Sequence, residues 1–212
     1  MKLYYSPGAS SLAPHIALRE AGRVFDIERV DLRAHRTASG TDFLTINPKG
    51  DVPALQLDGP QSLVLTENAA ILQYIADLVP NSGLAPPSGT FSRYHLQEWL
   101  AFIGTEIEKP FTPLFQPDSP ALTQERARGR IGERFVYVSG VLVDRAFLMG
   151  ETLTVADCYL FSVLRWCERF GLDLHLWPNL DQYFLRISER PSVHGALAAE
   201  GLIEARRYRR TA

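Results

Sequence analysis

Residues 46–75, INPKGDVPALQLDGPQSLVLTENAAILQYI, contain a turn, two strands and the start of a helix, and this order restricts the folds open to the chain. The turn is at 47–50 (NPKG), and β-type residues at 52–57 predict a strand with Pro53 at its beginning. Proline cannot donate a ladder hydrogen bond, so it is expected at a strand's first residue. A cis bond before Pro53 would turn the N–H and C=O of Val52 outward, where a ligand's own peptide could pair with them.

The returning strand is predicted at 63–65 (LVL), and a helix follows from Glu67 and Asn68 with apolar residues at helical spacing. The first turn of a helix has unpaired N–H groups and a partial positive charge, which suit a carboxylate. Together with the outward backbone of Val52, this helix start predicts a slot for a small peptide with an ionised end.

The preceding residues predict a strand at 2–5, a helix from about 12 to 22 and a second strand at 24–32. Ser11 is placed as the N-cap of that helix. A strand, a helix and a strand imply a parallel pair with a right-handed crossover. With the two later strands and their helix, the pattern predicts a small α/β domain with a mixed, four-stranded sheet.

A segment rich in Pro, Gly and Ser at 80–89 ends this pattern, and helical spacing of apolar residues dominates after it. We therefore predict a first domain at 1–80, a linker at 81–89, an all-helical domain at 90–203 and a basic tail at 204–212. Thr154 and Asp157 have the spacing of a capping box at a helix start.

Composition excludes several classes of function. A formal net charge of -2 provides no general attraction to nucleic acid, and no apolar run is long enough to cross a bilayer. We expect a cytoplasmic location, because no secretory signal pattern is present. The five histidines and two cysteines have no metal-ligand spacing, so no metal site is predicted. Phosphate-binding glycine loops are also missing from the sequence.

The motifs KLYYSPGASSLAPHIALREAG, NPKGDVPAL, LTENAAILQYIAD and TVADCYLF follow one another along the chain. Through them the chain resembles the cytosolic glutathione transferases, and most of all the bacterial beta class, from residue 2 to about 203. The resemblance implies a thioredoxin-like first domain, an all-helical second domain and a homodimer. It also implies that Val52 and Pro53 pair with the cysteinyl backbone of glutathione, and that Glu67 and Asn68 hold its γ-glutamyl end.

Residues 5–11 (YSPGASS) connect a strand end to a helix start, where N–H groups can stabilise the thiolate of glutathione. The beta class has a cysteine at the position of Ser10, so Ser10 cannot form the mixed disulfide which that cysteine permits. Ser10, Ser11 and Tyr5 are the candidates for the hydroxyl that faces the sulfur. Ser10 can equally be a helix cap, Ser11 is mainly a cap, and Tyr5 is more often a packed aromatic residue in this branch of the family.

Three further positions differ from the beta class. Where the beta class has a lysine at the glycyl carboxylate of glutathione, this chain has His35. Ala101 replaces an asparagine of the class, and Glu108 replaces a histidine near the sulfur. An ionised carboxylate near a thiol raises the pKa of that thiol. Glu108 therefore points away from the sulfur, or is protonated, or takes part in different chemistry.

The predicted function is conjugation of reduced glutathione to small hydrophobic electrophiles, as in detoxification, with no metal. Phe111, Phe115 and Trp166 either line the second-substrate pocket or belong to the core. The alternative is a non-catalytic protein of the same fold that binds glutathione or a hydrophobic ligand. A third possibility is a partner-binding protein with an empty slot.

Overall fold

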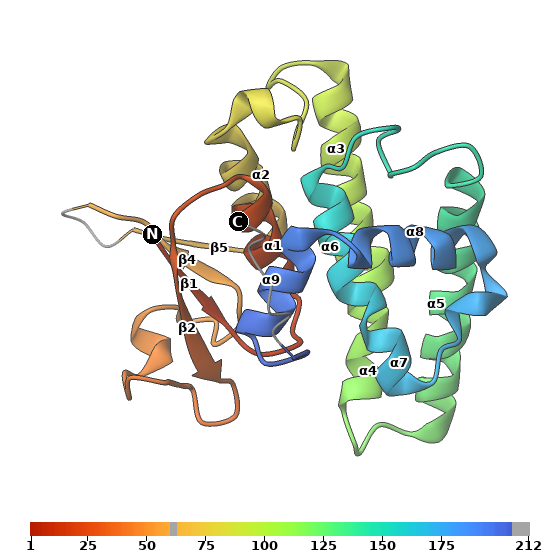
Figure 1. Ribbon diagram of the computed structural model, residues 1–212. Helices are drawn as coiled ribbons and strands as arrows, with labels where there is room; N and C mark the ends of the chain where they lie inside the picture. Colours follow the sequence, from red (N-terminus) through yellow and green to blue (C-terminus); the bar gives the residue numbers. More distant parts are fainter. Residues whose placement is uncertain (60–62, 205–212) are drawn as a thin grey trace.

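The computed structural model describes residues 1–59 and 63–204. The four arginines of the predicted basic tail, at 206, 207, 209 and 210, lie outside the described residues. The strands all come from residues 2–66, and the described elements after Thr66 are helical (Figure 1). The predicted order of an α/β domain followed by an all-α domain is confirmed.

The sheet has the strand order β3-β2-β1-β4-β5 and is mixed. β1 (Lys2–Tyr5) is parallel to β2 (Asp26–Asp31), whereas β4 (Ala54–Gln56) is antiparallel to both β1 and β5 (Val64–Thr66). The prediction of four strands needs one correction. β3 (Arg36–Thr37) adds a fifth, antiparallel edge strand, and two residues are too few to produce a strand pattern in the sequence.

The two faces of the sheet are buried differently, because successive side chains of a strand point to opposite faces. Leu3 and Leu55 belong to the main core, together with α1 (Leu12–Glu20) and α2 (Asn68–Asp77). Tyr4 and Ala54 point to the other face. There they form a small apolar cluster with Val30 and with Phe43, which lies on the 3-10 turn η1 (Phe43–Thr45).

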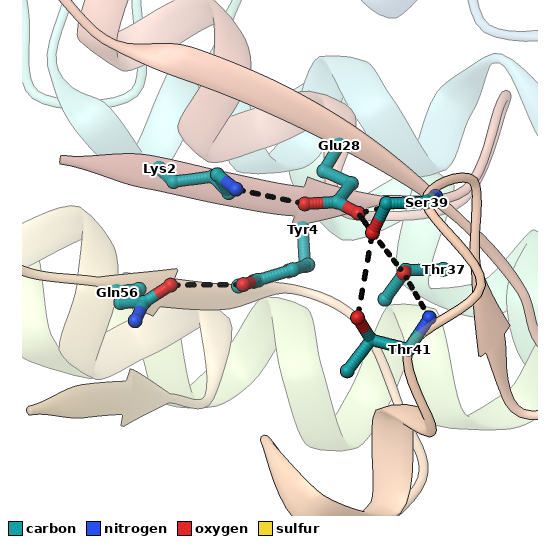
Figure 2. Close-up of polar contacts among 7 residues, drawn as sticks. All are labelled: Lys2, Tyr4, Glu28, Thr37, Ser39, Thr41 and Gln56. Carbon is teal, nitrogen blue, oxygen red and sulfur yellow. Dashed lines mark hydrogen bonds and ion pairs between the residues drawn. The ribbon is translucent and has the colours of Figure 1, made fainter. Parts of the chain in front are cut away.

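Beside this small cluster, polar side chains connect neighbouring strands (Figure 2). The Glu28 carboxylate accepts from Lys2 Nζ at 2.9 Å and from Ser39 Oγ at 2.6 Å. Tyr4 donates its hydroxyl to Gln56 Oε1 at 2.8 Å. These bonds join β1 to β2 and to β4, and join β2 to the turn after β3.

Three local predictions differ from the structure. The second strand begins at Asp26, and Val24 before it is 94% exposed. Pro53 precedes β4 and is not its first residue. Ser11 does not cap α1, because its backbone is already helical (φ -57°, ψ -15°), which is not the extended conformation of a capping residue. Its hydroxyl instead accepts from the N–H of Ser6 at 3.2 Å.

The helical part continues from a 3-10 turn, η2 (Pro80–Ser82). Its α-helices are α3 (Phe91–Phe102), α4 (Thr112–Phe115), α5 (Ala121–Val141), α6 (Val155–Leu164), α7 (Trp166–Phe170), α8 (Pro178–Ser188) and α9 (Pro191–Ala199). A π-helical segment, η3 (Ile103–Glu108), continues α3 and leads into the 3-10 turn η4 (Lys109–Phe111). A further 3-10 turn, η5 (Leu174–Leu176), precedes α8.

The predicted capping box at the start of α6 is confirmed. Asp157 Oδ2 accepts from the N–H of Thr154 at 2.7 Å.

Helix α1 joins the two parts of the fold. It packs against α2 on its own side and against α6 and α9 of the helical part (Figure 1). The loop before α1 therefore lies where the two parts meet. Among the described residues, no helix is both long and apolar enough to cross a membrane.

Candidate functional site

A cleft of about 740 Å³ lies between the sheet-containing part and the helical part. Its first wall comes from the loop before β4 and the start of α2, and its second wall comes from α3 and η3. The residues that line it are Ser10, Asn47, Lys49, Asp51, Val52, Pro53, Thr66, Glu67, Asn68, Ala69, Leu100, Ala101, Gly104, Thr105, Glu108, Lys109, Thr112 and Tyr159. The cleft brings together segments more than 100 residues apart in sequence.

The first wall presents free backbone groups to the cleft. The peptide bond between Val52 and Pro53 is cis, and both residues line the cleft. Within the described part of the chain, neither the N–H nor the C=O of Val52 has a hydrogen-bond partner. Backbone groups away from water are almost always paired, so these two can pair with an extended ligand in the cleft.

The start of α2 presents a second set of polar groups. Glu67 precedes the helix with a φ of 72°, and its exposed carboxylate is 2.5 Å from Lys49 Nζ. Lys49 also donates to Thr66 Oγ1 at 3.0 Å. Asn68 is buried, and its Oδ1 has no hydrogen-bond partner among the residues that the structure describes. A buried, unpaired acceptor beside a helix N-terminus can be satisfied by a polar ligand with an ionised end.

The carboxyl group of Glu108 lies in the cleft with the hydroxyl groups of Ser10 and Tyr159. Glu108, the last residue of η3, accepts a hydrogen bond from the Tyr159 hydroxyl of α6. Burial raises the pKa of the Glu108 carboxyl, and hydrogen bonds from Tyr159 and Ser10 only partly oppose this rise. Burial and the nearby Glu108 carboxylate also raise the pKa of Tyr159, so that tyrosine stays protonated. Ser10, Glu108 and Tyr159 form one cluster that faces the cleft.

Comparisons with known proteins agree with this geometry. Residues 1–77 match the glutathione S-transferase N-terminal domain family, and residues 102–191 match the glutathione S-transferase C-terminal domain family. The chain is 46% identical over 202 residues to glutathione S-transferase GstA of Escherichia coli O157:H7, covering 95% of this chain and 100% of GstA. This chain belongs to the glutathione S-transferase family.

Two solved structures resemble this transferase along its length. A bacterial beta class glutathione S-transferase of Sphingomonas chungbukensis is 48% identical, with a TM-score of 0.92, over 96% of this chain and 100% of that chain. A sphingomonad glutathione S-transferase complexed with glutathione is 46% identical, with a TM-score of 0.91, over the same shares of the two chains. The predicted family, thioredoxin-like fold and enzyme class are therefore confirmed.

Of the three hydroxyl candidates in this transferase, Ser10 lines the cleft, whereas Ser11 and Tyr5 do not. Ser11 is fully buried, with its hydroxyl bonded to Ser6. Tyr5 is also buried, and its ring centroid is 6.2 Å from that of His15 on α1. Burial and the nearby Glu200 carboxylate raise the pKa of Tyr5.

Most of the other predicted site residues line the cleft, and one does not. Val52, Pro53, Glu67, Asn68 and Glu108 line the cleft of the transferase, as does Ala101. His35 does not: it has a φ of 49° and packs on the turn at 47–50, where its Cε1 is 2.9 Å from the position of a Cβ on Gly50.

The aromatic residues proposed for a second-substrate pocket form a cluster outside the cleft. Phe111 is fully buried, and its ring centroid is 5.4 Å from that of Trp166. Phe115 is 38% exposed and packs on the same indole at 4.9 Å. Trp166 Nε1 donates to the C=O of Gly8 at 2.8 Å. These contacts indicate that the three aromatic residues pack on one another and support the loop before α1, and that they do not line the cleft.

Sequence reasoning missed Tyr159 and Lys49 as residues of the site. Tyr159 lies two residues after Asp157 of the capping box, in a run of apolar residues, and no local signal separates it from the core. In the sequence, Lys49 was recognised only as part of the turn at 47–50. The structure also shows no group of three or more His, Cys, Asp or Glu side chains within residues 1–59 and 63–204 that could hold a metal ion.

Proposed function

We propose that this transferase joins the thiol of reduced glutathione to small apolar electrophiles in the cleft between its two parts. The observation that carries the proposal is that the Val52 backbone and Asn68 Oδ1, both without a hydrogen-bond partner among the described residues, lie on one wall of that cleft. A tripeptide with an ionised γ-glutamyl end has the groups that match both.

Each part of glutathione has a partner in this proposal. Val52 pairs through its backbone with the cysteinyl residue, because that pairing needs one free donor and one free acceptor. The N–H groups at the start of α2 take the γ-glutamyl carboxylate. The Glu67 carboxylate takes the γ-glutamyl ammonium group and exchanges its present contact with Lys49 for it.

Ser10 is proposed to face the sulfur. It lines the cleft in front of α1, and its hydroxyl can donate one hydrogen bond to a thiolate. A serine cannot trap the sulfur covalently, so no disulfide exchange through Ser10 is expected. Ser10→Cys should introduce a thiol that attacks oxidised glutathione, forming a mixed disulfide and releasing one reduced glutathione, which mass spectrometry of the intact protein would detect.

Binding is tested by Glu67→Ala. Losing one charge-assisted hydrogen bond should weaken glutathione binding by about 1 to 3 kcal/mol. Glu151→Ala is the matched control, because Glu151 is exposed and outside the cleft. Calorimetric titration measures both. A wild-type protein whose melting temperature does not rise in millimolar glutathione would contradict the proposed site.

The second substrate is expected beside η3 and the end of α3, where Leu100, Ala101 and Gly104 leave an apolar, open wall. A panel of electrophiles of increasing apolar size tests this expectation by product formation with saturating glutathione. Glutathione binding without product from any member of the panel would favour the binding-protein alternative.

We also propose a homodimer in the cytoplasm. The dimer is supported by exposed apolar side chains on α3 and around the end of α5: Phe91, Tyr137 and Val143 are 78%, 53% and 61% exposed. They border a groove that Trp99 and Phe102 line. Large apolar side chains gathered on one surface are typical of protein interfaces.

A further inference from the structure

Glu108 is held in the cleft by an arrangement that extends over three segments. The π-helical segment η3 ends at Glu108, and π-helical turns occur often at functional sites. Tyr159 of α6 donates its hydroxyl to Glu108 Oε2, and Ser10, in the loop before α1, lines the same cleft with its hydroxyl near enough to lower the pKa of this carboxyl. A thiol beside Ser10 is therefore beside Glu108.

Gly104 provides the space for this contact. A Cβ on Gly104 would lie 3.2 Å from the Tyr159 hydroxyl oxygen, which is closer than nearly all real Cβ contacts. The absence of that side chain lets the tyrosine hydroxyl reach past η3 to Glu108. Tyr159 itself is 4% exposed, so packing within α6 fixes its ring.

We propose that the Glu108 carboxylate accepts the proton of the glutathione thiol, and that Tyr159 is the positioning residue which holds the carboxylate for this transfer. The inference rests on the proposed binding of glutathione in the cleft. The S–H bond breaks, an O–H bond forms on Glu108, and the sulfur lone pair forms a C–S bond with the electrophile. The leaving group departs with its bonding electrons, and Glu108 returns the proton to water before the next turnover.

Charge balance favours this step over loss of the thiol proton to solvent. A thiol beside a carboxylate has one negative charge, and a thiolate beside a carboxylic acid also has one. Loss of the proton to solvent would instead place two negative charges side by side, which low-dielectric surroundings disfavour. The raised pKa of Glu108 brings its proton affinity closer to that of the thiol, as general-base catalysis requires.

The groups around Glu108 are compatible with this role. Those that act on it are Ser10 before α1, Tyr159 on α6 and Glu67 at the start of α2. Asn68, Thr105 and Lys109 line the same cleft. The Glu67 charge raises the pKa of Glu108, and the proposed ammonium group of glutathione would neutralise that effect.

The test uses the whole enzyme with saturating reduced glutathione. Thiolate is measured by its ultraviolet absorbance across pH, and proton release by calorimetry in two buffers of different ionisation enthalpy. In the wild type, thiolate should form with clearly less than one proton released per thiolate. Release of one whole proton per thiolate would overturn the proposal. This measurement uses the wild-type enzyme alone. Failure of glutathione to bind would instead refute the proposed function.

Glu108→Gln should lower kcat/KM at neutral pH at least about tenfold, because the amide cannot take the thiol proton, while loss of the carboxylate charge by itself moves thiol ionisation to lower pH. Glu106→Gln is the matched control on the same segment. Glu106 pairs with Arg130 and Arg134 of α5, so this variant should leave kcat/KM unchanged. An equal or higher kcat/KM for Glu108→Gln would show that the carboxylate only repels the thiolate, and would overturn the proposal. A titration that coincides with the wild type would show that Glu108 does not act on the sulfur.

Tyr159→Phe tests the positioning role. Its hydroxyl lowers the pKa of Glu108, so its loss should move the acid limb of kcat/KM to higher pH while glutathione affinity changes less than about twofold. A role of Tyr159 in packing alone would change stability and leave this limb in place, and that outcome would overturn the assignment.

Discussion

Glu28 determines part of the acid stability of the fold. Burial alone would raise its pKa, but hydrogen bonds from Ser39, Lys2 and Thr37 outweigh burial and lower that pKa from 4.5 to about 2 (Figure 2). Because the folded pKa is below the unfolded one, the ionised carboxylate stabilises the fold above pH 4.5, and this stabilisation is lost as the pH falls through 2.

Glu28→Gln should therefore lower the free energy of unfolding by about 1 to 2 kcal/mol at neutral pH, an amount that allows for the partial exposure of Lys2. Urea unfolding at pH 7 and near pH 2 measures the effect, and the difference from wild type should disappear at the lower pH. Asp26→Asn, an exposed carboxylate on the same strand, serves as the control. An equal loss at both pH values would contradict the assignment to ionisation.

Gly104→Ala tests the space beside Tyr159. The added methyl group would displace the Tyr159 hydroxyl, so we expect the conjugation rate to fall several-fold with little change in glutathione affinity. Gly129→Ala is the matched control, because a Cβ on this helical glycine of α5 meets nothing within 4 Å. The control should be neutral or more stable by up to about 1 kcal/mol. Unchanged kinetics for Gly104→Ala would mean that the tyrosine has room to move.

At the scale of elements, the loop before α1 is held by the helical part. Glu200, directly after α9, has a fully buried side chain whose Oε1 is 2.8 Å from His15 Nδ1 of α1. Its Oε2 accepts from the N–H of Gly8 at 3.3 Å, and Trp166 donates to the C=O of the same glycine. The position of Ser10 therefore depends on α7 and α9 as well as on its own strand and helix.

Glu200→Ala should lower the free energy of unfolding by about 3 to 5 kcal/mol, because it leaves buried polar partners unpaired. Glutathione binding should weaken as well, since the loop that contains Ser10 loses a fixed contact. Chemical denaturation and calorimetric titration measure the two effects. Glu189→Ala, an exposed residue at the end of α8, is the control. A loss below about 1 kcal/mol for Glu200→Ala would contradict this account.

At the scale of the whole molecule, light scattering should give twice the mass of one 23.7 kDa chain at micromolar concentration. Tyr137→Arg should shift the protein toward the mass of one chain, since it places a charge on the apolar surface of α3 and α5. Leu176→Arg, at a more exposed apolar site on η5, should not change the mass. A wild-type mass of one chain would reject the dimer.

Much of the fold and part of the site follow from the sequence alone. The strands of β1, β4 and β5, the starts of α2 and α6 and the change to helices after residue 90 follow from turn residues, caps and apolar spacing, which act between near neighbours. Ser10, Val52, Glu67 and Asn68 could be named because each lies at a strand end or a helix start.

Only the tertiary structure decided which of these side chains share a cleft. Glu108 and Tyr159 are 51 residues apart, and their contact depends on how α6 packs against η3 and on the absence of a side chain at Gly104. The sequence left open whether Ser11, Tyr5 and Phe111 face the cleft, and the structure buries all three. The physical reason is that sequence patterns report local backbone preference and burial, whereas the partner of a polar group is determined by contacts between segments that fold from distant parts of the chain.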